Sequence, residues 1–139
     1  MTKIESTEKL IKANRDHVYN FVSDINNFNT LVPEDQVRDF ETEKDRCSFK
    51  VDGLGQVGVR VIEKEPGKYV MFESEGSIPF RFNMWIDLKD AGNETTAMKL
   101  TLKADLNMMM KMVAQKPMEE GLEVIASQLS DHLNRREWA

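Results

Sequence analysis

The 139-residue sequence contains a single cysteine, Cys47, and only two histidines, and each shortage excludes a class of protein. One cysteine cannot form a disulfide framework or a multi-cysteine zinc motif. His17 and His132 lie far apart in the sequence, without partners at metal-ligand spacing, so we expect no metal site and no cofactor. Because structural disulfides mark secreted proteins, their exclusion favours a cytoplasmic location.

Long hydrophobic runs and an excess of basic charge are also missing. No apolar run reaches the roughly 18 residues of a transmembrane helix, and the N-terminal "MTKIESTEKLIKAN" lacks the apolar stretch of a signal peptide. The net charge is −5, with acidic and basic residues interspersed, which is unlike a nucleic-acid-binding protein. We therefore expect neither stable membrane insertion nor nucleic-acid binding.

No repeat, linker or low-complexity tract divides the chain, so we expect one domain over residues 1–139. The stretch "TKIESTEKLIKA" predicts a first strand, and two short helices follow it. Asn14 can cap the first helix and Asp24 the second, and Pro33 would end the second.

From residue 36 to residue 106 the hydrophobic period changes from about 3.6 to about 2, which predicts six consecutive strands. Short breaks with turn residues, such as "EPGK" and "DAGNE", indicate antiparallel hairpins. The last third is helical, with Met118, Leu122, Ile125 and Leu129 on one face and Pro117 expected to kink or break the helix. This order predicts an α+β fold, in which a curved antiparallel sheet of about seven strands grips a long C-terminal helix.

Two stretches, "IKANRDHVYNFVSDINNFNTLVP" and "VIEKEPGKYVMFESEG", resemble the START-like or helix-grip superfamily, also called SRPBCC. Its members include polyketide cyclases and aromatases, plant pollen allergens and lipid-transfer domains. The resemblance covers the whole chain and is chiefly structural. It implies a ligand between the sheet and the long helix, entering near the N-terminus of that helix.

Strand alternation predicts which side chains face the helix. The inward sets are Cys47, Phe49 and Val51; Val57, Val59 and Val61; Val70, Phe72 and Ser74; Phe82, Met84, Ile86 and Leu88; and Met98, Leu100, Leu102 and Ala104. Ser74 is the one hydroxyl among them, and no carboxylate, lysine or histidine is present. General acid–base catalysis needs a titratable group beside the substrate, so the pattern favours a binding protein over an enzyme.

Three residues could still carry chemistry, and each has a plainer interpretation. His17 could point into the cleft from the first short helix, or it could be a partly exposed helix residue. Asp39 lies in a strand that alternates poorly and could be catalytic or simply solvated at an edge. Cys47 could be a nucleophile, or a small buried hydrophobic residue. Trp85 alternates outward, where a second subunit could cover it, so a homodimer is possible.

Five of the nine methionines lie between residues 106 and 122. They could fill the core, bind a metal, contact a membrane or form an adaptable wall at a ligand entrance, because methionine packs around varied shapes. Their crowding argues against a metal site, and Lys111 and Lys116 are few cations for a membrane-lying helix. We expect the adaptable wall, formed by Met109 and Met112 and hinged at Pro117.

The sequence therefore predicts a small apolar or lipid-like ligand held between the sheet and the C-terminal helix. The predicted ligand-binding residues are Phe49, Val59, Phe72, Ser74, Met84, Ile86, Met98, Leu100, Met109, Met112, Met118 and Leu122. Two alternatives stay open from the resemblance. One is an enzyme of the polyketide cyclase, aromatase or dehydratase type, and the other is a protein-interaction module like the chaperone activators of the same superfamily.

Overall fold

The structure is a computed structural model and describes residues 1–31, 37–51, 55–76, 78 and 80–135. The elements in chain order are β1 (Thr2–Glu5), β2 (Lys9–Ile11), α1 (Arg15–Val22), the 3-10 helix η1 (Ile25–Thr30), β3 (Val37–Glu43), β4 (Arg46–Val51), β5 (Gly55–Glu65), β6 (Tyr69–Glu75), β7 (Phe82–Gly92), β8 (Thr95–Ala104) and α2 (Met108–Asn134). Asn14 and Asp24 cap the two short helices as predicted. The expected stop at Pro33 lies outside the described residues.

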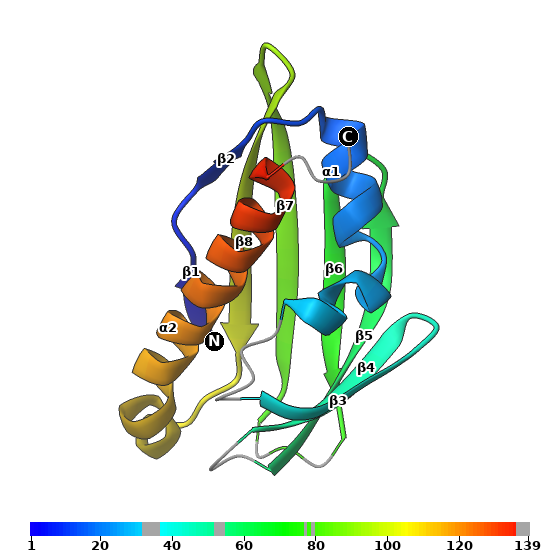
Figure 1. Ribbon diagram of the computed structural model, residues 1–139. Coiled ribbons are helices and arrows are strands. Elements are labelled where there is room, and N and C mark those ends of the chain that lie inside the picture. The colour runs from blue at the N-terminus through cyan, green and yellow to red at the C-terminus, as the bar shows by residue number, and fades with distance from the viewer. Residues whose placement is uncertain (32–36, 52–54, 77, 79, 136–139) are drawn as a thin grey trace.

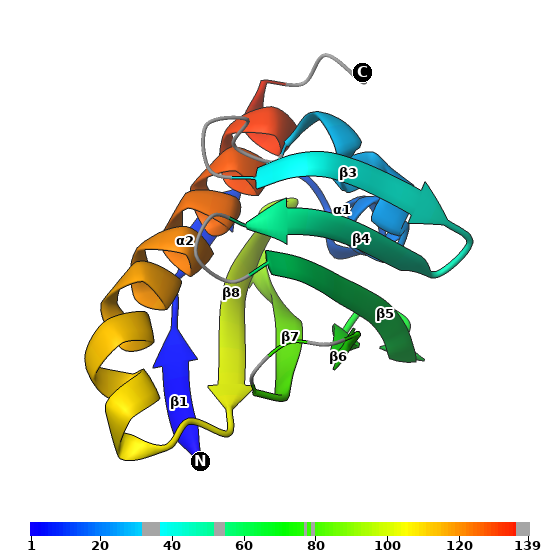
Figure 2. The same ribbon diagram turned by 90° about the horizontal axis from the view of Figure 1, so that it is seen from below.

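The strands form one antiparallel sheet in the order β1-β8-β7-β6-β5-β4-β3, and β2 also pairs with β8. From β3 to β8, neighbours in sequence are neighbours in the sheet, so short hairpin connections suffice, as the turn residues predicted. The sheet curves around the helices, which lie on its concave side (Figure 1 and Figure 2). The α+β class, the curved sheet and the long C-terminal helix are confirmed.

The first expected strand is in fact two strands, so the described residues form eight strands instead of about seven. Glu5 pairs with Thr101 and Lys9 pairs with Met98, so three residues of this segment oppose two residues of β8. The extra residue makes a bulge that separates β1 from β2. Ser6 stays attached to β8 within the bulge, because its hydroxyl accepts a backbone N–H bond of 2.9 Å.

Helix α2 packs chiefly against β1, β2 and β8, and α1 packs against β6, β7 and β8. The buried residues of α2 are Ala114, Leu122, Ala126, Leu129, Ser130 and Leu133. Glu123 ties α2 to the bulge, since its carboxylate lies 2.7 Å from the Lys9 ammonium and accepts the Thr7 N–H at 2.8 Å. These contacts fix the helix along the β1–β2 edge of the sheet.

The break considered at Pro117 does not occur, because α2 is one helix from Met108 to Asn134. Proline removes one backbone hydrogen bond, but packing on either side holds the helix together. Ala114 and Met118 contact the core around it, and the Gln115 amide donates to the Glu119 carboxylate at 3.1 Å. Within the described residues, no helix is both long and apolar enough to cross a membrane.

Candidate functional site

The inward-facing side chains form the core under the helices, as alternation predicted. Of the predicted site residues, Val59, Phe72, Ile86, Met98, Leu100 and Leu122 are buried core residues, and Phe49, Met84 and Met118 are partly exposed and pack against that core. Ile86, Met98 and Leu100 have no accessible surface, so they touch no space large enough for a water molecule. A ligand can therefore reach Phe49, Met84 and Met118 without rearranging the core, but not the three residues that have no accessible surface.

Strand β3 supplies an aromatic residue that the sequence reasoning missed. Asp39 and Phe40 together oppose Phe49 of β4, because the pairing shifts between Arg38 and Glu41. Asp39 takes a positive φ of 55° at this bulge. The bulge turns Phe40 to the inner face of the sheet, whereas unbroken alternation would place it on the outer face. The Phe40 and Phe49 rings stack, with centroids 6.0 Å apart and an interplanar angle of 21°.

Several elements contribute partly exposed apolar side chains to the concave side. We call five of them the concave apolar surface: Phe28 of η1, Phe40 of β3, Phe49 of β4, Met84 of β7 and Met118 of α2. Each is partly buried and packs against the core. Because α2 packs chiefly against β1, β2 and β8 while η1 packs against β3, the long helix does not bury these side chains completely.

Ser74 gives this side of the sheet a hydroxyl group. Its Oγ accepts the backbone N–H of Phe82 at 3.0 Å, one step beyond the last β6–β7 pair, Glu73 with Asn83. The hydroxyl thus extends the pairing of the two strands and keeps its own hydrogen available as a donor. The Ser74 hydroxyl therefore has a structural role, and it can also donate one hydrogen bond to a bound molecule.

Cys47 is the titratable member of the predicted inward set. Its side chain is buried, and burial, with a smaller effect of the Glu75 carboxylate, raises the pKa of the thiol to about 12. The thiolate is the nucleophilic form, so a thiol with this pKa is inert near neutral pH. The interpretation of Cys47 as a buried hydrophobic residue fits this environment.

The other candidate residues lie apart from one another. The His132 ring packs against the Phe21 ring at a tilt of 30°, with centroids 4.9 Å apart, and so joins α2 to α1. His17 is partly exposed on α1. Asp39 is an exposed residue whose carboxylate lies 3.5 Å from the Lys50 ammonium. Among the residues that the structure describes, no group of three or more acidic, histidine or cysteine side chains could hold a metal ion.

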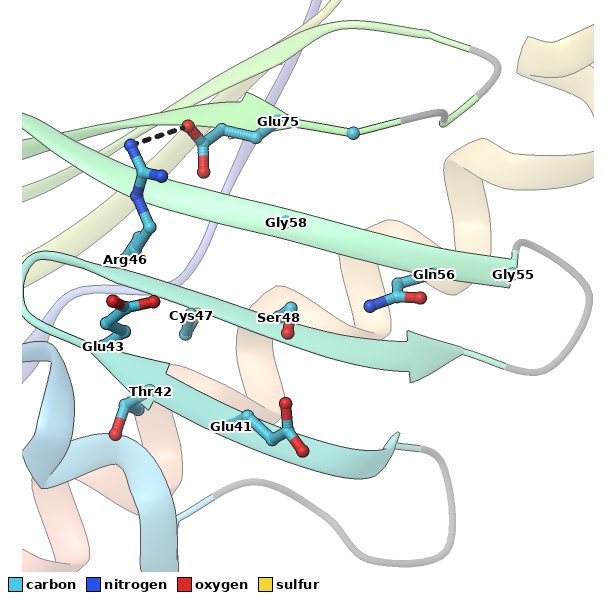
Figure 3. Close-up of a pocket in the computed structure, with 11 residues that line it drawn as sticks. Glu41, Thr42, Glu43, Arg46, Cys47, Ser48, Gly55, Gln56, Gly58 and Glu75 are labelled. Carbon is cyan, nitrogen blue, oxygen red and sulfur yellow. Dashed lines mark ion pairs between the residues drawn. The ribbon is translucent and has the colours of Figure 1, made fainter.

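A hollow lies on the opposite, convex face of the sheet, beside β3, β4 and β5 (Figure 3). It measures about 650 Å³, and its polar lining includes Glu41, Glu43, Arg46, Ser48, Gln56 and Glu75. Glu75 lies close to Gly58, because a Cβ at position 58 would be only 3.1 Å from the Cβ of Glu75. Glycine therefore suits this position in the floor of the hollow. Arg46 pairs with Glu75 at 3.4 Å, so this groove is an ion-paired polar surface.

Trp85 also lies on the convex face, as expected. The Lys103 ammonium lies 5.5 Å from the centroid of the Trp85 ring, and the indole is only partly exposed. This cation–π contact covers part of the ring within one chain. The homodimer that an outward tryptophan suggested stays a prediction.

The methionines divide between two sides of α2. Met110 and Met118 pack against the core, whereas Met109 is 76% exposed and Met112 is 82% exposed. Core filling is therefore wrong for Met109 and Met112, and their side chains do not join the concave apolar surface. Steps of four backward from Leu122 pass through Met118, Ala114 and Met110, so the helical spacing could have identified the inner methionines.

No protein-family model matches the chain, and no curated protein matches it in sequence. Solved structures do match. The protein TTHA0849 from Thermus thermophilus superposes with a TM-score of 0.73 at 20% identity, covering 98% of this chain and 99% of that one. Norcoclaurine synthase from Thalictrum flavum, in complex with dopamine and hydroxybenzaldehyde, gives a TM-score of 0.80 at 12% identity, covering 98% of this chain and 88% of that one.

The chain has the helix-grip fold. A further match is the di-domain ARO/CYC BexL from the BE-7585A biosynthetic pathway, with a TM-score of 0.73 at 15% identity, covering 94% of this chain and 46% of that one. The resemblance found in the sequence is thus confirmed at the level of the helix-grip fold. Because one fold carries many functions, likeness at these identities specifies no ligand.

Proposed function

We propose that the protein binds a small apolar or lipid-like molecule at the concave apolar surface, between the sheet and α2. The observation that carries this proposal is the contrast between the two faces of the sheet. On the inner face Phe40, Phe49 and Met84 stay partly exposed, while the outer face carries ion pairs such as Arg60 with Glu73 at 2.7 Å. Covering apolar surface contributes roughly 25 cal/mol per Å², and the Ser74 hydroxyl offers one orienting hydrogen bond.

The named relatives of this fold support a small ligand. Norcoclaurine synthase was solved with dopamine and hydroxybenzaldehyde, so a protein of similar shape holds two small aromatic molecules. The composition described above supports a cytoplasmic site of action for this chain. The protein would then act as an intracellular binding protein for an apolar compound.

An enzyme of the cyclase or aromatase type is the second candidate, supported by the names of norcoclaurine synthase and the ARO/CYC protein. The thiol of Cys47 argues against an enzyme, because its pKa is raised to about 12 and it is therefore unreactive near neutral pH. Such an enzyme would have to take its acid or base from outside the predicted strand faces. Turnover of an aromatic polyketide that fails in a His17→Gln or Asp39→Asn variant would favour the enzyme.

The binding proposal is tested with two methionines on neighbouring strands. Met84 of β7 lies on the concave face, and Met71 of β6 is a partly exposed residue that pairs with the outward Trp85. An apolar fluorescent dye should bind the native protein and be displaced by fatty acids or by aromatic compounds. Met84→Gln should weaken this binding about tenfold, and Met71→Gln should leave it unchanged. Equal affinities in both variants, or no displacement by any apolar compound, would contradict the proposal.

A further inference from the structure

The first two turns of α2 carry an apolar face that points away from the core. Its members are Met108 at 81%, Met109 at 76%, Met112 at 82% and Val113 at 69% exposed. Their spacing of one and four residues places them on one side of the helix, opposite Met110 and Ala114, which contact the core. Contiguous exposed apolar side chains of this size mark an interaction surface rather than ordinary solvated helix.

Two lysines accompany this face in a chain of net charge −5. They are few for a helix held stably in a membrane, but each contributes about 1 kcal/mol near an anionic surface, which suits reversible docking. Lys116 follows Met112 by one turn on the same side, and Lys111 lies at the flank, both exposed. The N-terminus lies at the same end of the molecule as the start of α2 (Figure 1 and Figure 2), since Thr2 pairs with Ala104. The Met1 side chain there is 84% exposed. This end therefore combines apolar side chains with ammonium groups.

Acidic residues limit the face on its C-terminal side. Glu119 and Glu120 follow Lys116 within one turn, and both are exposed. Carboxylates would be repelled by an anionic surface and would keep the later turns in water. The combination of apolar and cationic groups is thus confined to residues 108–116.

We propose that the methionine face, formed by Met108, Met109, Met112 and Val113 with Lys111 and Lys116, docks reversibly on an anionic lipid surface. The unbranched thioethers enter the irregular boundary between headgroups and acyl chains. The lysines extend along them and place their ammonium groups at the lipid phosphates. A second copy of the chain is a poorer partner for this face. Each partner of a stable protein complex buries about 800 Å² of surface, and three methionines and a valine expose a smaller area than that.

Docking goes beyond the proposed ligand binding and does not depend on it. The test is sedimentation of the whole protein with vesicles of phosphatidylcholine alone and with vesicles of phosphatidylcholine and phosphatidylglycerol in equal amounts. The protein should bind the anionic vesicles more tightly, and added salt should weaken that binding. The double variant Lys111→Gln/Lys116→Gln should lose about fivefold in affinity for each lysine removed.

The apolar contribution is tested by Met109→Gln/Met112→Gln, which should weaken vesicle binding at least about tenfold. Its matched control is Leu10→Gln/Ile62→Gln, two apolar residues of β2 and β5 that are 60% and 40% exposed, and this pair should leave binding unchanged. Thermal unfolding of every variant checks that the fold is intact. The proposal would be overturned if the protein does not bind anionic vesicles. It would also be overturned if Met109→Gln/Met112→Gln binds them as tightly as the control pair does. A concentration-dependent dimer that Met109→Gln/Met112→Gln abolishes would overturn it in favour of a second copy.

Discussion

At the scale of single residues, backbone conformation decides which side chains reach the concave apolar surface. Asp39 is the clearest case, since its φ of 55° turns Phe40 inward to stack on Phe49. Residues other than glycine cost roughly 1–2 kcal/mol in this left-handed region, and aspartate tolerates it better than most. The concave apolar surface therefore depends on a residue that does not itself line it.

Substitution of Asp39 tests this dependence. Asp39→Val should lower the free energy of unfolding by about 1–2 kcal/mol, because a β-branched residue is strained at positive φ. Asp39→Gly should stay within about 1 kcal/mol, since it relieves the backbone and loses only an exposed ion pair with Lys50. Urea unfolding measures both, and Glu41→Val on the same strand is the control for strand propensity. Equal effects of Asp39→Val and Glu41→Val would contradict the strained bulge.

Cys47 should react with a thiol reagent only when the protein unfolds. Burial raises the pKa of its thiol to about 12, so almost no thiolate exists at pH 8. Labelling with an aromatic disulfide at pH 8 should be slow in buffer and as fast as a free thiol in denaturant. Rapid labelling of the native protein would show that the thiol is accessible and would reopen a nucleophilic role.

The sequence was sufficient for the faces of five strands, since alternation correctly separated buried from outward residues between β4 and β8. It failed at β3 for a physical reason. A bulge inserts one residue into the period of two, and an aspartate at positive φ is a weaker marker of a bulge than a glycine. Phe40 was therefore missed, and with it the stacked ring pair.

At the scale of elements, α2 joins two surfaces of different character. Its inner side carries Met110 and Met118 against the core, and its first two turns expose Met109 and Met112. The spacing of apolar residues predicted the turns of the helix after Pro117. Its continuity through Pro117 was not predicted, because proline normally disrupts a helix and the packing of Ala114 and Met118 against the core compensates for it here.

The two sides of α2 should respond differently to truncation. Met118→Ala should lower the free energy of unfolding by about 1–3 kcal/mol, because a partly buried side chain leaves a cavity. Met109→Ala should change it by less than about 0.5 kcal/mol, as expected for an exposed residue. Chemical denaturation of the two variants compares them directly. A large loss in Met109→Ala would mean that the outer methionine is packed.

The contact between α2 and the β1–β2 bulge should make stability depend on acid pH. The Lys9 ammonium first, and then the Thr7 N–H, lower the pKa of Glu123 from 4.5 to about 2. A group with a depressed pKa in the folded state stabilises the protein above pH 4.5 and loses that contribution as the pH falls toward 2. Because Glu123 is more than a third exposed, its contribution is only about 1 kcal/mol.

Glu123→Gln should therefore lower the free energy of unfolding at pH 7 by about 1 kcal/mol and flatten its decline between pH 4.5 and pH 2. Thermal unfolding across this range measures the effect. Glu120→Gln, an exposed residue on the same helix, is the control and should keep the original profile. Identical profiles for both variants would show that Glu123 does not fasten the helix.

At the scale of the whole molecule, one sheet separates an apolar inner side from a polar outer side. The inner side holds the core and the concave apolar surface, and the outer side holds ion pairs and the groove beside Gly58. Element order and the alternation of β4–β8 were enough to predict this architecture. They could not predict which inward residues stay accessible, because that depends on where α2 and η1 rest on the sheet.

The central claim is that the inner side holds a small apolar molecule. Native mass spectrometry of the protein purified from its own host, alongside Met84→Gln and Met71→Gln purified in the same way, tests it most directly. The unaltered protein and Met71→Gln should each carry an added small-molecule mass that disappears on denaturation, and Met84→Gln should carry much less of it. A bare chain mass in all three proteins, or equal retention by Met84→Gln, would contradict the claim.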